Sequence, residues 1–236
     1  MTEEKIIFEN QDTNIQETVK KSKKKPPLTL EEKQKEKIKR QYIRQFQRQQ
    51  TEFLLVSVFN EKTSQENEKY RKTNPIMESL RNGACYCSPI EIKKNIPYDS
   101  FCYIIEMHNH INKIAAIGRI KAKPRSEKHN IYEDKNYHRF YYLGKYRIKR
   151  EDMTKEEDEI MKILDILCFT GNTHMKRNQG LKCFPNRILY DLKENPNEIF
   201  NKNKYFKLPL EKKEIKKESL DLLKKIQNMF SMRNYI

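Results

Sequence analysis

SFCYIIEMHNHINKIAAIGRIKA, residues 100–122, carries the clearest strand pattern in the chain. Its first half is rich in β-branched and aromatic residues, and the same pattern resumes after the turn-forming letters NHIN. Two such segments around a short polar turn predict adjacent strands. RFYYLGKYRIKR, residues 139–150, predicts a further strand in which Gly144 marks a bulge or a turn. We therefore expect a small, mostly antiparallel sheet.

Helical patterns follow these strands along the chain. EDMTKEEDEIMKILDIL, residues 151–167, places Thr154 and Glu157 at capping-box spacing, and its apolar residues recur with helical periodicity. Residues 184–194 and 212–231 predict two more helices, of which the second is strongly amphipathic. A sheet accompanied by separate helices indicates an α+β fold.

The N-terminal part is expected to lie outside the core. Residues 1–27 are predicted to be a disordered basic tail, because they offer too little apolar surface to offset the entropy of ordering. Residues 28–74 are predicted to form a long polar helix, extending to residue 59, and then a linker. The α+β core is expected to span residues 75–236.

The net charge indicates the class of partner. Among 236 residues, 49 are Lys or Arg and 33 are Asp or Glu, so the formal net charge is +16. Such an excess favours polyanions, with nucleic acid first and an anionic membrane surface second. The alternative is that an AT-rich genome has enriched the chain in lysine throughout, and clustering of the charge is what separates the two.

Other features of the composition predict the compartment. No apolar run approaches the roughly 20 residues that a membrane-spanning helix needs, and no secretory signal is recognisable. We expect a soluble intracellular protein that is not secreted and has no membrane partner. Five cysteines without a regular framework predict free thiols in a reducing compartment.

Basic residues cluster in the predicted sheet. Residues 113–150 hold 12 Lys and Arg against three Asp and Glu, a net +9 that exceeds half of the charge of the whole chain. Six Phe and Tyr side chains are interleaved with them. Cations along phosphates, with aromatic faces for bases, are what single-stranded nucleic acid requires.

Side-chain alternation along 139–150 divides this stretch into two faces. Phe140, Tyr142, Tyr146 and Ile148 are expected toward the core. The candidate nucleic-acid-binding residues of the sheet are Arg119, Lys121, Arg139, Tyr141, Lys145, Arg147 and Lys149. The alternative is that the aromatic residues are core and the lysines are its solvated back.

A basic loop, residues 171–182, follows the acidic start and apolar face of the 151–167 helix. Gly171 and Gly180 are backbone-permissive positions that suit close approach of a phosphate backbone. The candidate binding residues of the loop are His174, Lys176, Arg177 and Lys182. A solvated loop between two elements is the alternative.

Motifs for catalysis, metals and cofactors are missing from the sequence. It has no phosphate-binding glycine loop, no nucleophile elbow and no zinc-protease motif, and its Cys and His spacings match no structural zinc site. Glu106 and Asp134 could be imagined as a metal-binding carboxylate pair, but no spacing singles them out. We predict no catalytic residue, no metal and no cofactor.

Several stretches resemble one viral protein group. YCSPIEIKKNIP, IIEMHNHINKIAAIGRIKA, IYEDKNYHRFYYLGKYRI and DILCFTGNTHMKRNQGLKCFP are similar to segments that recur in this order in uncharacterised proteins of nucleocytoplasmic large DNA viruses. The resemblance covers roughly residues 85–190. It implies a viral protein of the host cytoplasm (the viral factory) or of the virion, and it implies no established activity.

A second resemblance concerns the fold. A strand, then KIAAIGRI, a charged loop and another aromatic strand is similar to the pattern of PUA-like and EVE/YTH-type barrels, which bind RNA or modified bases. It implies a PUA-like barrel as the alternative to an open sheet. This chain contains no Trp, so the aromatic cage of that group cannot be placed in it.

Together these patterns predict a non-enzymatic nucleic-acid-binding protein, with RNA and DNA both open. A virion or genome-packaging protein, in contact with other virion proteins, is the first alternative. A nuclease or base-modifying enzyme with unidentified carboxylates is the second.

Overall fold

The computed structural model describes residues 27–80, 83–127, 129–171, 174–196 and 220–235. The chain divides into two compact units, Met1–Lys39 and Arg40–Ile236. Helix α1 (Leu30–Gln49) confirms the long N-terminal helix, and none of its residues is buried. Thr29 and Glu32 form a capping box at its start, with N–O distances of 2.8 and 3.2 Å. The predicted disordered tail lies outside the described residues, apart from Pro27.

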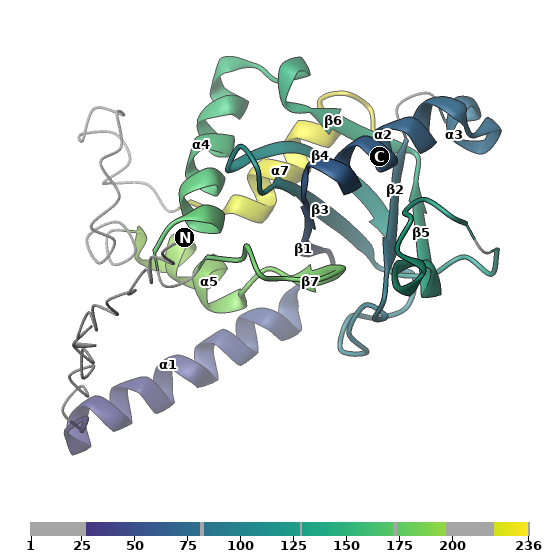
Figure 1. Cartoon of the computed structure of the whole chain (residues 1–236). Coiled ribbons are helices and arrows are strands. Elements are labelled where there is room, and N and C mark those ends of the chain that lie inside the picture. Colours follow the sequence, from purple (N-terminus) through teal and green to yellow (C-terminus); the bar gives the residue numbers. More distant parts are fainter. Residues whose placement is uncertain (1–26, 81–82, 128, 172–173, 197–219, 236) are drawn as a thin grey trace, which may run out of the picture. The chain divides into compact units, whose positions relative to one another are not determined.

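A five-stranded sheet forms the centre of the second unit (Figure 1). The strand order is β6-β4-β3-β1-β7, in which β1 and β3 are parallel and all other neighbours are antiparallel. The bounds are Phe53–Phe59 for β1, Phe101–His108 for β3, Lys113–Lys121 for β4, Tyr146–Lys149 for β6 and Leu181–Cys183 for β7. The hairpin predicted from residues 100–122 is therefore confirmed, as is the mostly antiparallel α+β fold.

A second sheet pairs β2 (Ala84–Ser88) with β5 (Phe140–Gly144). The interruption predicted at Gly144 is where the chain leaves this sheet, and it enters the larger sheet at β6. A Cβ atom on Gly144 would lie 1.8 Å from the carbonyl oxygen of Arg119, so a glycine is needed for this close approach. The described strands close no barrel, and the open sheet is the alternative that the structure supports.

The prediction for residues 50–74 is wrong in two places. Residues 53–59 are a strand rather than the end of a helix, and residues 61–73 form helix α2 (Glu61–Thr73) rather than a linker. β1 is almost entirely buried, and a strand buried on both faces reads as a continuous apolar run that resembles a buried helix. In α2 the one buried residue is Asn67, so this helix shows no apolar stripe in the sequence.

The remaining helices agree with the sequence patterns. α4 begins with the predicted Thr154–Glu157 capping box, and a short helix, α3, follows Asn74. Of the predicted 212–231 helix, residues 212–219 lie outside the described residues. The bounds are Pro75–Ser79 for α3, Lys155–Phe169 for α4, Asn186–Glu194 for α5 and Leu222–Ser231 for α7, with short 3-10 helices at Lys135–Arg139 and Arg150–Asp152.

The larger sheet separates two hydrophobic cores. Ile105 and Ile117 belong to a core with residues of α4, α5 and α7, whereas Ile104 belongs to a second core with residues of β2, β5 and α3. Burial of both faces explains why β1 and β3 are apolar over most of their length.

Two sequence-based statements concern membranes and thiols. Within the described residues, no helix combines the length and the apolar character that crossing a membrane requires. All five cysteines are unpaired, and Cys102 and Cys168 are buried.

Candidate nucleic-acid interface

A polar cavity of about 270 Å³ lies at the C-terminal end of β1. Six parts of the chain form it: the end of β1, the start of α2, β2, the β3–β4 turn, the 132–137 segment and the basic loop. Its lining residues are Ser57, Val58, Phe59, Asn60, Thr63, Cys87, Asn109, Tyr132, Tyr137, Lys176, Arg177, Asn178, Gln179 and Gly180. We call it the first cavity.

The basic loop is attached to the core beside this cavity. Met175 is buried, and its backbone N–H donates to the carbonyl of Cys168 at 2.8 Å. The amide nitrogen of Asn109, in the β3–β4 turn, donates to the carbonyl oxygen of Lys176 at 2.9 Å. These contacts hold Lys176 and its neighbour at the rim of the cavity rather than leaving the loop free in solvent.

Gly180 ends the loop in a conformation that suits glycine. Its φ is 64°, and a Cβ atom there would lie 2.3 Å from the hydroxyl oxygen of Ser88. The same hydroxyl accepts a hydrogen bond from the N–H of Leu181, the first residue of β7. The sequence analysis related Gly180 to the close approach of a phosphate backbone. In the structure, packing against Ser88 already requires a glycine at this position.

Two tyrosines line the first cavity together with Phe59. The rings of Tyr132 and Tyr137 meet edge to face, with centroids 5.7 Å apart. Asn67 of α2 donates to the hydroxyl of Tyr132 at 2.9 Å and fixes the ring from the inside. Burial raises the pKa of both tyrosines, so both hydroxyls stay protonated at neutral pH.

Amide side chains supply the hydrogen-bonding groups. Asn178 and Gln179 line the first cavity, and their side chains make no hydrogen bond to other described residues. The side-chain oxygen of Asn109 is buried and also has no partner in the described part of the chain. An amide offers both donors and acceptors, so this set can pair with the edge of a polar ring.

A second, more open cavity of about 500 Å³ adjoins the first and shares Tyr132 with it. Its other lining residues are Asn130, Glu133, Lys135, His138 and Arg139. Lys135 and Arg139 belong to the 3-10 helix that follows the Tyr132 segment. Tyr132 therefore lines two cavities, each of which also has basic side chains in its lining.

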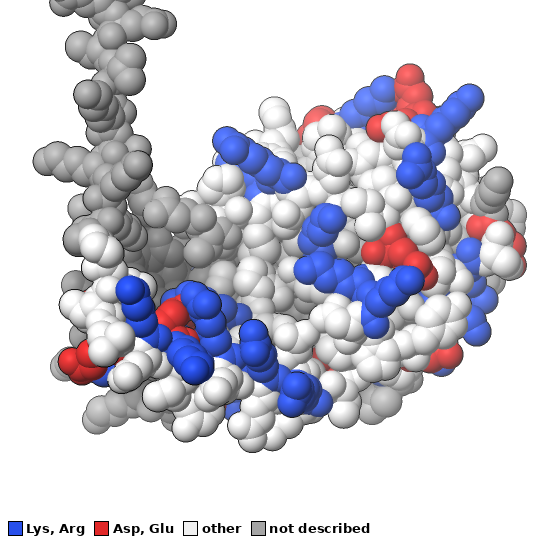
Figure 2. Space-filling view, turned by 90° about the horizontal axis from the view of Figure 1, so that it is seen from below, with Lys and Arg blue, Asp and Glu red and all other residues white. Residues whose placement is uncertain are grey.

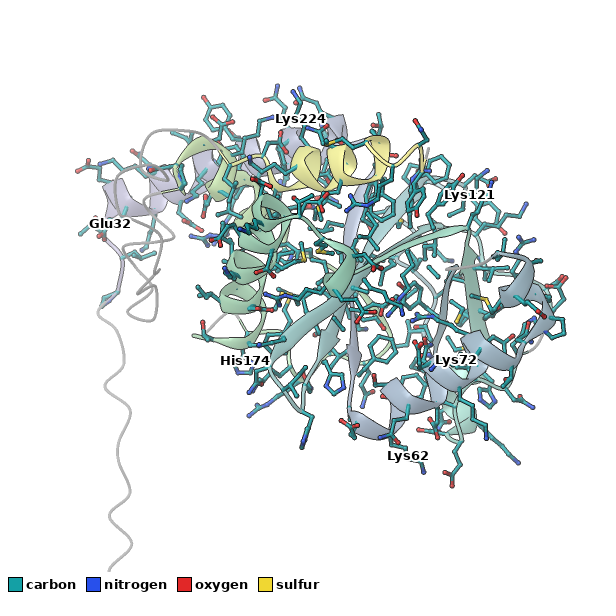
Figure 3. All side chains as sticks on the ribbon, turned by 90° about the horizontal axis from the view of Figure 1, so that it is seen from above. Glu32, Lys62, Lys72, Lys121, His174 and Lys224 are labelled. Atoms are coloured by element: carbon teal, nitrogen blue, oxygen red, sulfur yellow. The ribbon has the colours of Figure 1, made fainter. Side chains whose placement is uncertain are left out.

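The structure brings three of the predicted binding residues to these cavities. Lys176 and Arg177 line the first cavity, and Arg139 lines the second. His174 is exposed in the same loop as the first two. In Figure 3, His174 lies toward the same side of the view as Lys62 at the start of α2.

Other predicted residues lie away from the cavities. Lys121 lies toward the opposite side of Figure 3 from His174. Lys145 is exposed and stacks over the ring of Tyr146, Lys149 pairs with Glu151 at 3.2 Å, and Lys182 lies within β7. Figure 2 shows Lys and Arg side chains in several separate groups on the face it displays, with Asp and Glu among them. Total charge therefore does not single out one site.

Three predicted residues are used inside the protein. Tyr141 is 2% exposed, because its ring packs against those of Tyr70 and His129. Arg119 is 8% exposed, lies over the ring of Phe101 and donates to the carbonyl of Tyr235 at 3.1 Å. The prediction that these side chains share one solvent-facing surface with the lysines is wrong for both.

Arg147 is the third predicted binding residue whose side chain is used inside the protein. Its side chain is 9% exposed and makes two hydrogen bonds to Glu106. Arg71 of α2 and the hydroxyl of Tyr86 also donate to Glu106, at 3.1 and 2.7 Å. Burial acting alone would raise the pKa of Glu106, but the guanidinium groups of Arg147 and Arg71 outweigh it and hold that pKa well below its usual value.

The contacts of Glu106 also argue against a metal-binding pair made of Glu106 and Asp134. Glu106 is committed to two arginines, and the carboxylate of Asp134 accepts the backbone N–H of Asn136 at the start of the 3-10 helix. Within the described ranges, no group of three or more His, Cys, Asp and Glu is arranged to hold a metal ion.

The chemistry of the first cavity favours binding over covalent catalysis. Cys87 is the one lining residue with a thiol, and burial raises its pKa to about 12, so it is protonated at neutral pH and a poor nucleophile. The other polar and aromatic groups of the lining are amides, the hydroxyls of Ser57 and Thr63, the rings of Phe59 and the two tyrosines, and two cations. Such groups can form hydrogen bonds, ring contacts and ion pairs with a ligand.

Sequence reasoning did not find Asn109, Tyr132, Tyr137, Asn178 or Gln179 as site residues. The two tyrosines were present in the aromatic count of 113–150, and the letters NQ in the basic loop were visible. What brings them together is the pairing of β1 with β3 and β7, and a single sequence carries no signal for that pairing.

In comparisons with protein families, with curated proteins and with solved structures, no match to this chain was found.

Proposed function

We propose that this protein binds nucleic acid at the first cavity and does so without catalysing a reaction. One observation carries the proposal: Lys176 and Arg177 of the basic loop line the same cavity as Tyr132 and Tyr137. The loop and the tyrosines are almost 40 residues apart in sequence, and each was noted separately for its charge or its aromatic content.

The physical basis is that the cationic and the aromatic side chains of the cavity contact different parts of a nucleic acid. Cationic side chains contact phosphates and position the strand, whereas aromatic rings and amide edges contact the bases. Arg177 is exposed and forms no ion pair with any described residue, so it is available to a phosphate. Lys176 is half-buried, with its ammonium group 5.9 Å from the centre of the Phe169 ring.

The proposal includes the viral origin expected from the sequence resemblance. A nucleic-acid-binding protein of a large DNA virus would act on viral or host nucleic acid in the infected cytoplasm, or on the genome in the virion. Other virion proteins are then possible further partners.

The test is a titration of the purified full chain with labelled single-stranded and duplex RNA and DNA, followed by fluorescence anisotropy over a series of salt concentrations. We expect the logarithm of the affinity to fall linearly with the logarithm of the salt concentration. For a single strand, loss of two phosphate contacts in a Lys176→Ala, Arg177→Ala variant should reduce that slope by about 1.4.

A variant with the same change in charge is the control. Lys224→Ala with Lys225→Ala removes two exposed cations from α7, and Figure 3 places Lys224 toward the opposite side from His174. Its affinity and slope should equal those of the wild type. Equal losses in both variants would indicate packaging-type binding by total charge, and no binding at low salt would overturn the proposal.

A further inference from the structure

The second cavity places further cations next to the proposed site. It shares Tyr132 with the first cavity, and Lys135 and Arg139 line it. Both side chains are exposed, and neither forms an ion pair with another described residue. Lys176 and Arg177 line the first cavity and Lys135 and Arg139 the second, so each of the two cavities that Tyr132 lines has two of these cations in its lining.

The segment that carries Lys135 and Arg139 has a defined conformation. The carboxylate of Asp134 accepts the N–H of Asn136 at 2.9 Å and caps the 3-10 helix. A ring nitrogen of His138 lies 2.6 Å from the carbonyl oxygen of Tyr132, which links this helix to the buried tyrosine. The backbone that carries the two cations is therefore fixed relative to Tyr132.

The carboxylate among the residues that line the second cavity is that of Glu133, and it forms an ion pair with Lys62 of α2. Asp134 accepts a backbone N–H and does not line this cavity. With Glu133 paired to Lys62, the cationic groups that line the second cavity are the ones left to attract an anion.

We propose that the ligand is a single strand that crosses Tyr132, with its backbone on Lys176 and Arg177 on one side and on Lys135 and Arg139 on the other. This inference rests on the proposed function and names the form of nucleic acid that the site accepts. One base of the strand enters the first cavity, between the tyrosine pair and the amides of Asn178 and Gln179.

The position of the tyrosines explains why a single strand is required. Tyr132 is 6% exposed, and the first cavity is smaller than the roughly 300 to 1,000 Å³ of drug-sized sites, so it admits a group about the size of one base. In a duplex each base is stacked on both faces and paired at its edge, and it reaches such a cavity only after it has been unstacked.

The experiment uses a 12-nucleotide single strand, its duplex, and the same single strand with abasic sites in place of its central bases. We expect a Lys135→Ala, Arg139→Ala variant to reduce the salt slope for the single strand by about 1.4, as the Lys176→Ala, Arg177→Ala variant does, and the combined variant by about 2.8. The abasic strand should bind the wild type at least about fivefold more weakly.

The outcomes separate this inference from the proposed function. If the single strand binds and depends on Lys176 and Arg177 but not on Lys135 and Arg139, the crossing strand is wrong and nucleic-acid binding stands. Equal affinity for the single strand, the duplex and the abasic strand would also show that the crossing strand is wrong while nucleic-acid binding stands. If the wild type binds none of them, both proposals fail. Circular dichroism of each variant shows that folding is intact.

Discussion

The guanidinium group of Arg147 and the carboxylate of Glu106 form a two-point contact in the protein interior, with N–O distances of 2.8 and 2.7 Å. Arg147 lies on β6 and Glu106 on β3, so the contact spans β4, which runs between them. Gly118 of β4 is paired with Arg147 and has no side chain, which leaves room for the contact and for the hydroxyl of Tyr86. Arg147, which its charge alone had assigned to a phosphate, therefore connects β6 to β3 across β4.

Replacing Glu106 with Gln should strongly destabilise the protein. Two buried guanidinium groups would lose their carboxylate, and breaking a buried ion pair by removing one partner costs about 3–5 kcal/mol. Urea unfolding followed by circular dichroism measures this change. Glu133→Gln, at an exposed carboxylate, is the control and should change the free energy of unfolding by less than about 1 kcal/mol. A cost for Glu106→Gln as small as that of the control would contradict the prediction.

The same carboxylate predicts a dependence of stability on pH. The pKa of Glu106 is lower in the folded protein than its usual value of 4.5, so its contribution is fully present above that value and is lost as the pH falls below it. Urea midpoints measured between about pH 7 and pH 3 should decrease in this acid range. The decrease should be smaller in Glu106→Gln than in the wild type, provided that the variant folds, and an equal decrease would assign the effect to other carboxylates.

Gly118→Ala should be destabilising because of Tyr86. A Cβ atom at position 118 would lie 2.1 Å from the hydroxyl oxygen of Tyr86, and overpacking of this kind typically costs about 1–3 kcal/mol. Tyr86→Phe removes that oxygen, so the double variant should lose less stability than the sum of the two single variants. Additive losses in this double-mutant cycle would show that the contact with Tyr86 is not the cause.

Tyr137→Ala should weaken binding of a single strand without changing its salt dependence. Loss of a ring that contacts a base costs about 1–3 kcal/mol, whereas the salt slope reports phosphate contacts. Tyr137→Phe keeps the ring and should bind nearly as well as the wild type. Tyr98→Ala, at a tyrosine that is 61% exposed and does not line either cavity, is the matched control. Anisotropy titrations of the three variants decide the matter.

A mutation of Asn109 tests whether the loop must be held in place. Asn109→Ala removes the hydrogen bond to the carbonyl oxygen of Lys176 but changes no charge. We expect weaker binding because Lys176 and Arg177 would be less well positioned, while the net charge stays the same. Thermal unfolding measured alongside shows whether the effect is local. Unchanged affinity would mean that the other attachments of the loop are sufficient.

Much of the fold followed from local patterns. The hairpin of residues 100–122 and the start of α4 depend on periodicity and on a capping box, which involve residues close together in the sequence. β1 and α2 were misjudged because burial on both faces hides the period of a strand, and a polar helix with Asn67 as its one buried residue has no apolar stripe. The identity of β1 and α2 depends on what packs against them, and residues close together in the sequence do not show this.

The site was less predictable than the fold. Lys176, Arg177 and Arg139 were found from charge and line the two cavities, but charge also selected Arg119 and Arg147, whose partners come from other elements. A cation that pairs with a buried carboxylate looks the same in a sequence as one that faces solvent. Only the pairing of β6, β4 and β3 reveals that Arg147 lies beside Glu106.

The position of β1 in the sheet has a consequence for how the chain folds. β1 is an early strand, yet one of its neighbours is β3 and the other is β7, which begins at Leu181. Pairing across such sequence separation makes folding slow, and until Leu181 has emerged from the ribosome one edge of the apolar segment FLLVSVF has no partner. Chains that end before β7 should therefore be prone to aggregate during synthesis.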